Sequence, residues 1–154
     1  INYTARPVEG TIARGDMASY ENKNDSTGYA RSAVVKNPLD FSTIDMKEAE
    51  RLYLVNCAIC HGTKLDGNGP LWNGGDGPYP AAPKNLLADD MKAMAEGTMF
   101  HSLTYGKNLM GSYASQLNTV QRWEVIAYIK MKQGNVPTIT TTTVVVDTTA
   151  AGTK

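Results

Sequence analysis

Apolar and polar positions follow a helical period in two long stretches of the chain and two short ones. From residue 45 to residue 60, apolar side chains recur every three or four positions, which predicts a helix that ends at two cysteines. Residues 119–133 repeat the pattern and predict a last helix. Two short helices are predicted near 89–96 and 98–105. No strand pattern occurs between them, so the sequence predicts a small all-α domain.

Residues that start and stop helices stand at the expected ends. Asp45 followed by Glu48 predicts a capping box, and Asn118 with Gln121 supplies the start signal of the last helix. Three glycines are expected to close helices, namely Gly97, Gly106 and Gly134.

The chain divides into three parts by composition. Residues 41–135 hold the predicted helices, together with a loop over 62–85 that contains six glycines and four prolines. Residues 1–40 are polar and lack helical periodicity, which predicts an irregular arm that is either flexible or docked on a partner. Residues 136–154 form a Thr- and Val-rich tail of high β-propensity, which predicts an extended segment outside the core.

Composition narrows the function classes. The 154 residues carry 15 basic and 15 acidic side chains, and a net charge of zero argues against nucleic acid as a partner. No apolar run reaches the roughly 18 residues that a membrane-spanning helix needs. Two cysteines and two histidines are too few for a disulfide scaffold, a structural zinc site or a four-thiolate cluster.

The two cysteines lie in one short motif, Cys57-Ala58-Ile59-Cys60-His61. C-x-x-C-H is the attachment signature of a c-type haem, because two thiols at this spacing can add to two vinyl groups on one porphyrin edge. The next residue then presents its imidazole to the iron. A redox dithiol shares the C-x-x-C spacing and is the alternative, but no βαβ pattern surrounds the motif. We therefore expect one covalent haem c, attached through Cys57 and Cys60 and ligated by His61.

The second axial ligand is expected to be Met110. It lies in a predicted loop between Gly106 and Gly111, where glycine lets the backbone approach a porphyrin. His101, Met99 and an open site are the alternatives. The remaining downstream methionines fall in amphipathic helices and are expected in the core or on the surface: Met91, Met94 and Met131.

Several motifs together resemble a class I mono-haem cytochrome c over residues 45–133. They are Leu52-Tyr53, the run from Cys57 to Gly62, Asp66-Gly67-Asn68-Gly69-Pro70, Gly106-x-x-x-Met110 and Arg122-Trp123 with Tyr128-Ile129. The resemblance implies that the first helix crosses the last, with Ala49 opposite Tyr128. It also implies that a proline carbonyl accepts the imidazole N–H of the proximal histidine, with Pro70 and Pro83 both suitable by position.

Residues Met99–Leu117 and the leader Pro7–Thr11 are further similar to the mono-haem cytochrome c subunit of bacterial alternative complex III. That resemblance implies a subunit of a membrane complex that oxidises quinol and passes electrons towards a terminal oxidase. Its partners would be other subunits of the complex, including another cytochrome c or an oxidase. Such subunits commonly carry a lipid anchor, which here would lie upstream of Ile1 or be absent.

These features predict a one-electron carrier with His61 and Met110 on the iron and no catalytic site of its own. Because thioether attachment takes place outside the cytoplasm, we expect the protein on the periplasmic side of the bacterial inner membrane, peripheral or lipid-anchored. A diffusible periplasmic cytochrome c is the first alternative. A haem enzyme or sensor with an open distal site is the second.

Overall fold

The computed structural model describes residues 20–135, and the expected tail over 136–154 lies outside this part. Six α-helices occur in it, and two short 3₁₀ turns lie at Phe41–Thr43 and Asn73–Gly75. The helices are α1 Ser26–Ser32, α2 Met46–Asn56, α3 Ala58–His61, α4 Asp89–Ala93, α5 Glu96–Tyr105 and α6 Thr119–Lys132. The described residues form no β-strand, so the predicted all-α class is confirmed. None of these helices is both long enough and apolar enough to cross a bilayer.

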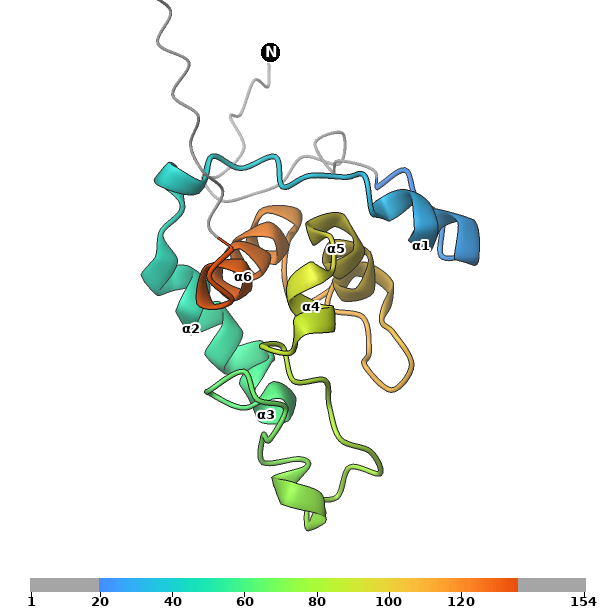
Figure 1. Ribbon diagram of the computed structural model, residues 1–154. Helices are drawn as coiled ribbons and strands as arrows, with labels where there is room; N and C mark the ends of the chain where they lie inside the picture. The colour runs from blue at the N-terminus through green and yellow to red at the C-terminus, as the bar shows by residue number, and fades with distance from the viewer. Residues whose placement is uncertain (1–19, 136–154) are drawn as a thin grey trace, which may run out of the picture.

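Four of the helices pack side by side in the order α2, α6, α5, α1 (Figure 1). Between α2 and α6, the rings of Tyr53 and Tyr128 lie 5.4 Å apart, and Ala49 is fully buried. Between α5 and α6, Phe100 stacks on Trp123 at 4.2 Å between ring centroids. Aromatic side chains from three helices therefore pack in the core among aliphatic ones. The first and last helices of the predicted domain do pack together.

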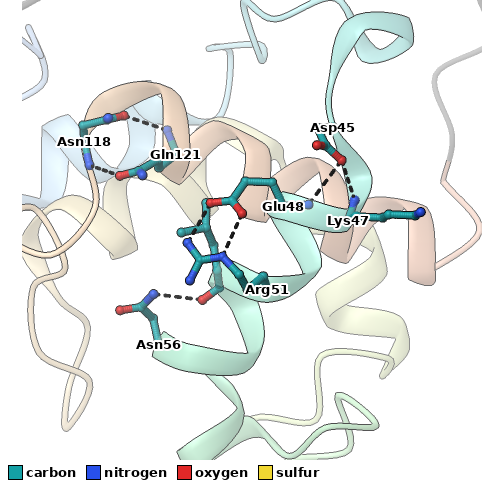
Figure 2. A network of polar contacts seen from close by, with 8 residues as sticks. Asp45, Lys47, Glu48, Arg51, Asn56, Asn118 and Gln121 are labelled. Carbon is teal, nitrogen blue, oxygen red and sulfur yellow. Dashed lines mark hydrogen bonds and ion pairs between the residues drawn. The ribbon is translucent and has the colours of Figure 1, made fainter. Parts of the chain in front are cut away.

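The starts of α2 and α6 are capped in two different ways (Figure 2). Asn118 accepts from the Gln121 N–H while the Gln121 side chain accepts from the Asn118 N–H, so α6 begins with a complete capping box. Asp45 accepts from the backbone at the start of α2, but the carboxylate of Glu48 turns towards Arg51 instead. The capping box predicted for α2 is thus only half formed, because an arginine one turn later competes for the glutamate.

The structure interrupts the predicted first helix. Cys57 lies between α2 and α3 with φ −114° and ψ −35°. The other four residues of the C-x-x-C-H motif therefore form a separate short helix. The first short helix also ends earlier than predicted, at Ala93. Gly97 therefore does not close it, and instead is the second residue of α5. Gly106 and Gly134 do follow helix ends and have positive φ, as expected of glycine in that position.

The irregular arm predicted over residues 1–40 is wrong for part of its length. Ser26–Ser32 form α1, which is capped by Asp25 and packs on α5. Its last residue, Ser32, is fully buried. The contact depends on Gly97, because a Cβ there would lie 2.1 Å from the Ser32 carbonyl oxygen. Residues 1–19 of the arm lie outside the described residues.

The close approach at Gly97 gives a stability prediction. Replacing Gly97 with alanine adds a methyl group that also meets the Val35 backbone, so the end of α1 must move off α5. Overpacking of this kind costs about 1–3 kcal/mol, more than the gain in helix propensity. We expect a lower free energy of unfolding in urea and faster proteolysis of the segment before residue 40. A melting curve equal to that of the wild type would contradict this role of Gly97.

Candidate functional site

All four residues predicted to bind haem line one cavity of about 540 Å³: Cys57, Cys60, His61 and Met110. The cavity lies between the α2–α3 junction, the loop before α4, helix α5 and the turn after it. Most of its other lining is apolar and comes from the loop, α4, α5 and α6. These residues are Ala81, Ala82, Pro83, Leu86, Met91, Met94, Met99, Leu103 and Ile129.

The helical turn with the cysteines and His61 is held by the loop that follows it. The backbone N–H groups of Gly67, Gly69 and Leu71 donate to the carbonyls of His61, Cys60 and Ile59, respectively. These carbonyls would otherwise be free at the C-terminus of a four-residue helix. Glycine at position 69 is required, since a Cβ would lie 2.4 Å from the Ile59 carbonyl oxygen. The glycine-rich loop thus fixes the helical turn that carries the motif.

The imidazole of His61 is oriented by a backbone carbonyl. Its Nδ1 lies 2.9 Å from the carbonyl oxygen of Lys84, so the proton sits on Nδ1 and Nε2 is left as a ligand atom. The structure therefore corrects the expectation for Pro70 or Pro83, because the carbonyl belongs to the residue after Pro83. Burial lowers the pKa of His61, and the hydrogen bond to Lys84 partly offsets this effect. A lowered pKa favours the neutral imidazole, which is the form that binds a metal.

The two thiols are not set up as a redox pair. Burial and the neighbouring Cys60 raise the pKa of Cys57 to about 12, and burial also raises the pKa of Cys60. Reactive dithiols in C-x-x-C motifs instead have a lowered pKa, which supplies the attacking thiolate. No disulfide joins the two cysteines. Two thiols with raised pKa values beside an apolar cavity fit covalent attachment of a porphyrin better than thiol–disulfide exchange.

Met110 closes a tight turn after α5. The N–H of Lys107 donates to the Met110 carbonyl and the N–H of Met110 donates back to Lys107, at 2.9 and 3.0 Å. Gly106 has φ 86°, and a Cβ there would lie 2.5 Å from the Met110 carbonyl oxygen. Asn108 also adopts a left-handed conformation, with φ 54°. The glycine four residues before Met110 is therefore a requirement of this turn.

Three hydrogen bonds fasten this turn to the rest of the cavity wall. The hydroxyl of Tyr79, in the glycine-rich loop, donates to the carbonyl of Leu109. After the turn, Ser112 and Tyr113 donate to carbonyls at the end of α5, at 2.6 and 2.9 Å. Met110 is thus held by contacts on both sides of it, although the turn itself is exposed at Leu109.

The other candidate ligands fall into two groups. His101 does not line the cavity: it is 3% exposed, lies among three tyrosine rings and has Nδ1 3.1 Å from the Tyr20 hydroxyl. His101 is therefore not placed to be a ligand of a haem in this cavity. Met99 does line the cavity, as do Met91 and Met94. Met131 packs against the core.

The residues present fit a covalently attached haem. The cavity is large and mostly apolar, as a porphyrin requires, and it gathers two thiols, a neutral imidazole and a thioether. In residues 20–135, no three His, Cys, Asp or Glu side chains come together as ligands of a bare metal ion. The donor set of the cavity would suit an iron that is held mainly by a macrocycle.

Comparison with known proteins agrees with this donor set. The model of the family described as cytochrome c oxidase, cbb3-type, subunit III, matches residues 45–129. The matched segment begins at the cap of α2 and ends within α6, so it covers both sides of the cavity. No curated protein matches the chain.

Proposed function

The chain belongs to this cytochrome c family, and we propose that it is the haem c subunit of a membrane complex that oxidises quinol. The family carries covalently bound haem c and transfers electrons. The observation that most supports haem binding is the shared cavity, where the C-x-x-C-H helix and the Met110 turn come from distant parts of the chain.

Within this proposal, each residue of the site has one task. Cys57 and Cys60 form the two thioether bonds to one haem, and His61 binds the iron through Nε2, oriented by the carbonyl of Lys84. Met110 supplies the sixth ligand. When bound, the haem supplies reversible one-electron cycling of its iron between Fe(III) and Fe(II). With His61 and Met110 both bound to the iron, no position would be left for a substrate, and the subunit would only carry electrons.

The surroundings of the site favour the reduced state. A thioether ligand raises the reduction potential of a haem iron, and so does an apolar pocket that disfavours the extra positive charge of Fe(III). The lining from α4 and α5 is apolar and buried, with Met91 and Met99 at 7% and 6% exposure. Such a carrier suits electrons that come from quinol and go on to an oxidase.

The assignment to a quinol-oxidising complex rests on sequence similarity outside the C-x-x-C-H motif. Residues 99–117 and the leader at 7–11 are similar to the mono-haem subunit of alternative complex III, whereas the family description names an oxidase subunit. We place the protein on the periplasmic side of the bacterial inner membrane, peripheral or lipid-anchored, because haem c is attached outside the cytoplasm. Its direct partners in this proposal are other subunits of that complex and the next redox protein.

Isolation from native membranes tests this proposal. The tagged full chain should co-purify, after detergent extraction, with integral membrane subunits, and added quinol should reduce its haem within the assay. Recovery of the chain alone from the soluble fraction, with no reduction by quinol, would contradict the complex and favour a diffusible carrier. Co-purification of the chain with a terminal oxidase, in a complex whose haem c is not reduced by quinol, would also contradict the proposal.

The tether between Tyr79 and the Met110 turn gives a prediction. Replacing Tyr79 with phenylalanine removes the hydroxyl that donates to Leu109 and keeps the ring in place. A hydrogen bond of this kind contributes about 0.5–1.5 kcal/mol. We expect the free energy of unfolding to fall by that amount and the Met110–iron bond to be lost at a lower urea concentration. Unfolding curves that coincide with those of the wild type would show that this hydrogen bond does not stabilise the turn.

A further inference from the structure

One wall of the haem cavity comes from the N-terminal arm. Tyr29 lies on α1, outside the segment that matches the cytochrome c family, yet its side chain lines the cavity. Residues 45–129 therefore do not complete the site by themselves. A helix outside that segment, packed on α5, supplies a further lining residue (Figure 1).

Tyr29 is in contact with the turn that carries Met110. The ammonium group of Lys107 lies 3.8 Å from the centroid of the Tyr29 ring, a cation–π geometry. Lys107 is also the residue whose backbone exchanges two hydrogen bonds with Met110. Its ammonium makes no salt bridge with any carboxylate in the described part of the chain. The ring of Tyr29 is thus the partner that the structure gives to this side chain.

The helix that presents Tyr29 is itself held firmly on α5 and α6. The Tyr105 hydroxyl donates to the carbonyl of Asn22 at 2.9 Å, and the side chain of Asn37 donates to the carbonyl of Trp123 at 3.1 Å. Tyr20 packs against Phe100 and contacts the buried His101. These contacts lie on both sides of α1, so Tyr29 is fixed relative to the cavity and can hold Lys107 in turn.

We propose that Tyr29 and Lys107 are a positioning pair for the distal ligand, through which the arm helix keeps Met110 on the iron. The proposal rests on the proposed ligation by Met110. The cation–π contact fixes Lys107, and its paired backbone then keeps the turn from moving outward, away from the cavity. Without the contact, the turn keeps the hydrogen bond from Tyr79, and Ser112 and Tyr113 still donate to the end of α5, but the turn opens more often.

The test compares Tyr29→Leu with Tyr29→Phe in the haem-loaded full chain. Phenylalanine keeps the ring face and serves as the matched control, whereas leucine removes it. CO can bind the reduced protein only when Met110 leaves the iron, so its binding rate reports how often the turn opens. We expect the rate to rise about two- to fivefold in Tyr29→Leu and to stay at the wild-type value in Tyr29→Phe.

A second pair of variants changes Lys107, the other residue of the cation–π contact. Lys107→Gln should raise the CO binding rate by a similar factor, and Lys107→Arg should keep it near the wild-type value. The double variant Tyr29→Leu/Lys107→Gln should be no faster than either single variant, because both changes remove the same contact. Fully additive effects, or equal rates in Tyr29→Leu and Tyr29→Phe, would overturn the pairing.

The ferric spectrum separates the two possible failures. A wild-type protein that shows the Met–Fe(III) charge-transfer band, with variants that all bind CO at the same rate, would overturn only the positioning pair. A wild-type protein without the band would overturn ligation by Met110, and with it the positioning role of Tyr29 and Lys107. Partial loss of the band in Tyr29→Leu, with full retention in Tyr29→Phe, would support the proposal directly.

Discussion

Replacing Met110 with alanine is expected to abolish the near-infrared Met–Fe(III) charge-transfer band and to open the haem to CO. The thioether is the only group that this substitution removes from the turn, because the paired backbone of Lys107 and Met110 is kept. Loss of a thioether ligand also lowers the reduction potential, by roughly 0.1–0.2 V out of the roughly 0.8 V that axial ligands span. Near-infrared absorption, CO binding and a redox titration check these three effects.

Met99 provides the matched control for this experiment. It lines the same cavity and is 6% exposed, but it belongs to α5 and not to the tethered turn. Met99→Leu is expected to keep the band and the CO resistance, with a small loss of stability because the volume is nearly conserved. The reverse result, with the band lost in Met99→Leu and kept in Met110→Ala, would move the sixth ligand onto α5.

Replacing both Cys57 and Cys60 with alanine is expected to remove all covalently bound haem. Each thiol forms one thioether bond, so the double variant has none, and its haem should be extracted by acidified organic solvent. Haem staining of the denatured chain on a gel should fall from full intensity to background. The apolar cavity and His61 remain in this variant, so haem that stays bound without a covalent bond is compatible with the account.

The single cysteine variants refine that prediction. With Cys57 or Cys60 alone replaced, one thioether bond remains and one vinyl group stays conjugated with the ring. The haem should then stay on the denatured chain, and its reduced absorption bands should move to longer wavelength. Two single variants with wild-type spectra, or a double variant that still stains fully, would contradict attachment through these thiols.

Much of the fold could be predicted from short-range patterns. Helix α6 carries its own start and stop signals, and the predicted start signal at Asn118 forms as a complete capping box. Helix α1 was missed because it has seven residues and a central Gly28, which gives little periodicity. Its stability comes from packing against α5 through Gly97, which lies more than sixty positions away. A pattern read over a short window contains no signal for such a contact.

The residues of the candidate site also differ in whether a local sequence signal could predict them. The C-x-x-C-H motif and the glycine before Met110 are local signals, and the structure brings these residues to one cavity. The partner of His61 is a backbone carbonyl, which any residue can supply, so the sequence pointed to a proline instead of Lys84. Tyr29 and Tyr79 were missed because each reaches the Met110 turn from a segment far away in the chain. An aromatic residue inside a polar segment is the one signal that could have indicated Tyr29.

The near-infrared spectrum of the oxidised wild-type protein, recorded together with CO binding to the reduced form, tests the central claim most directly. That claim is a haem c with His61 and Met110 as its two axial ligands. With both ligands on the iron, the oxidised protein should show a Met–Fe(III) charge-transfer band, and the reduced protein should not bind CO rapidly. A spectrum without the band, combined with rapid CO binding, would contradict it and would indicate an open distal site.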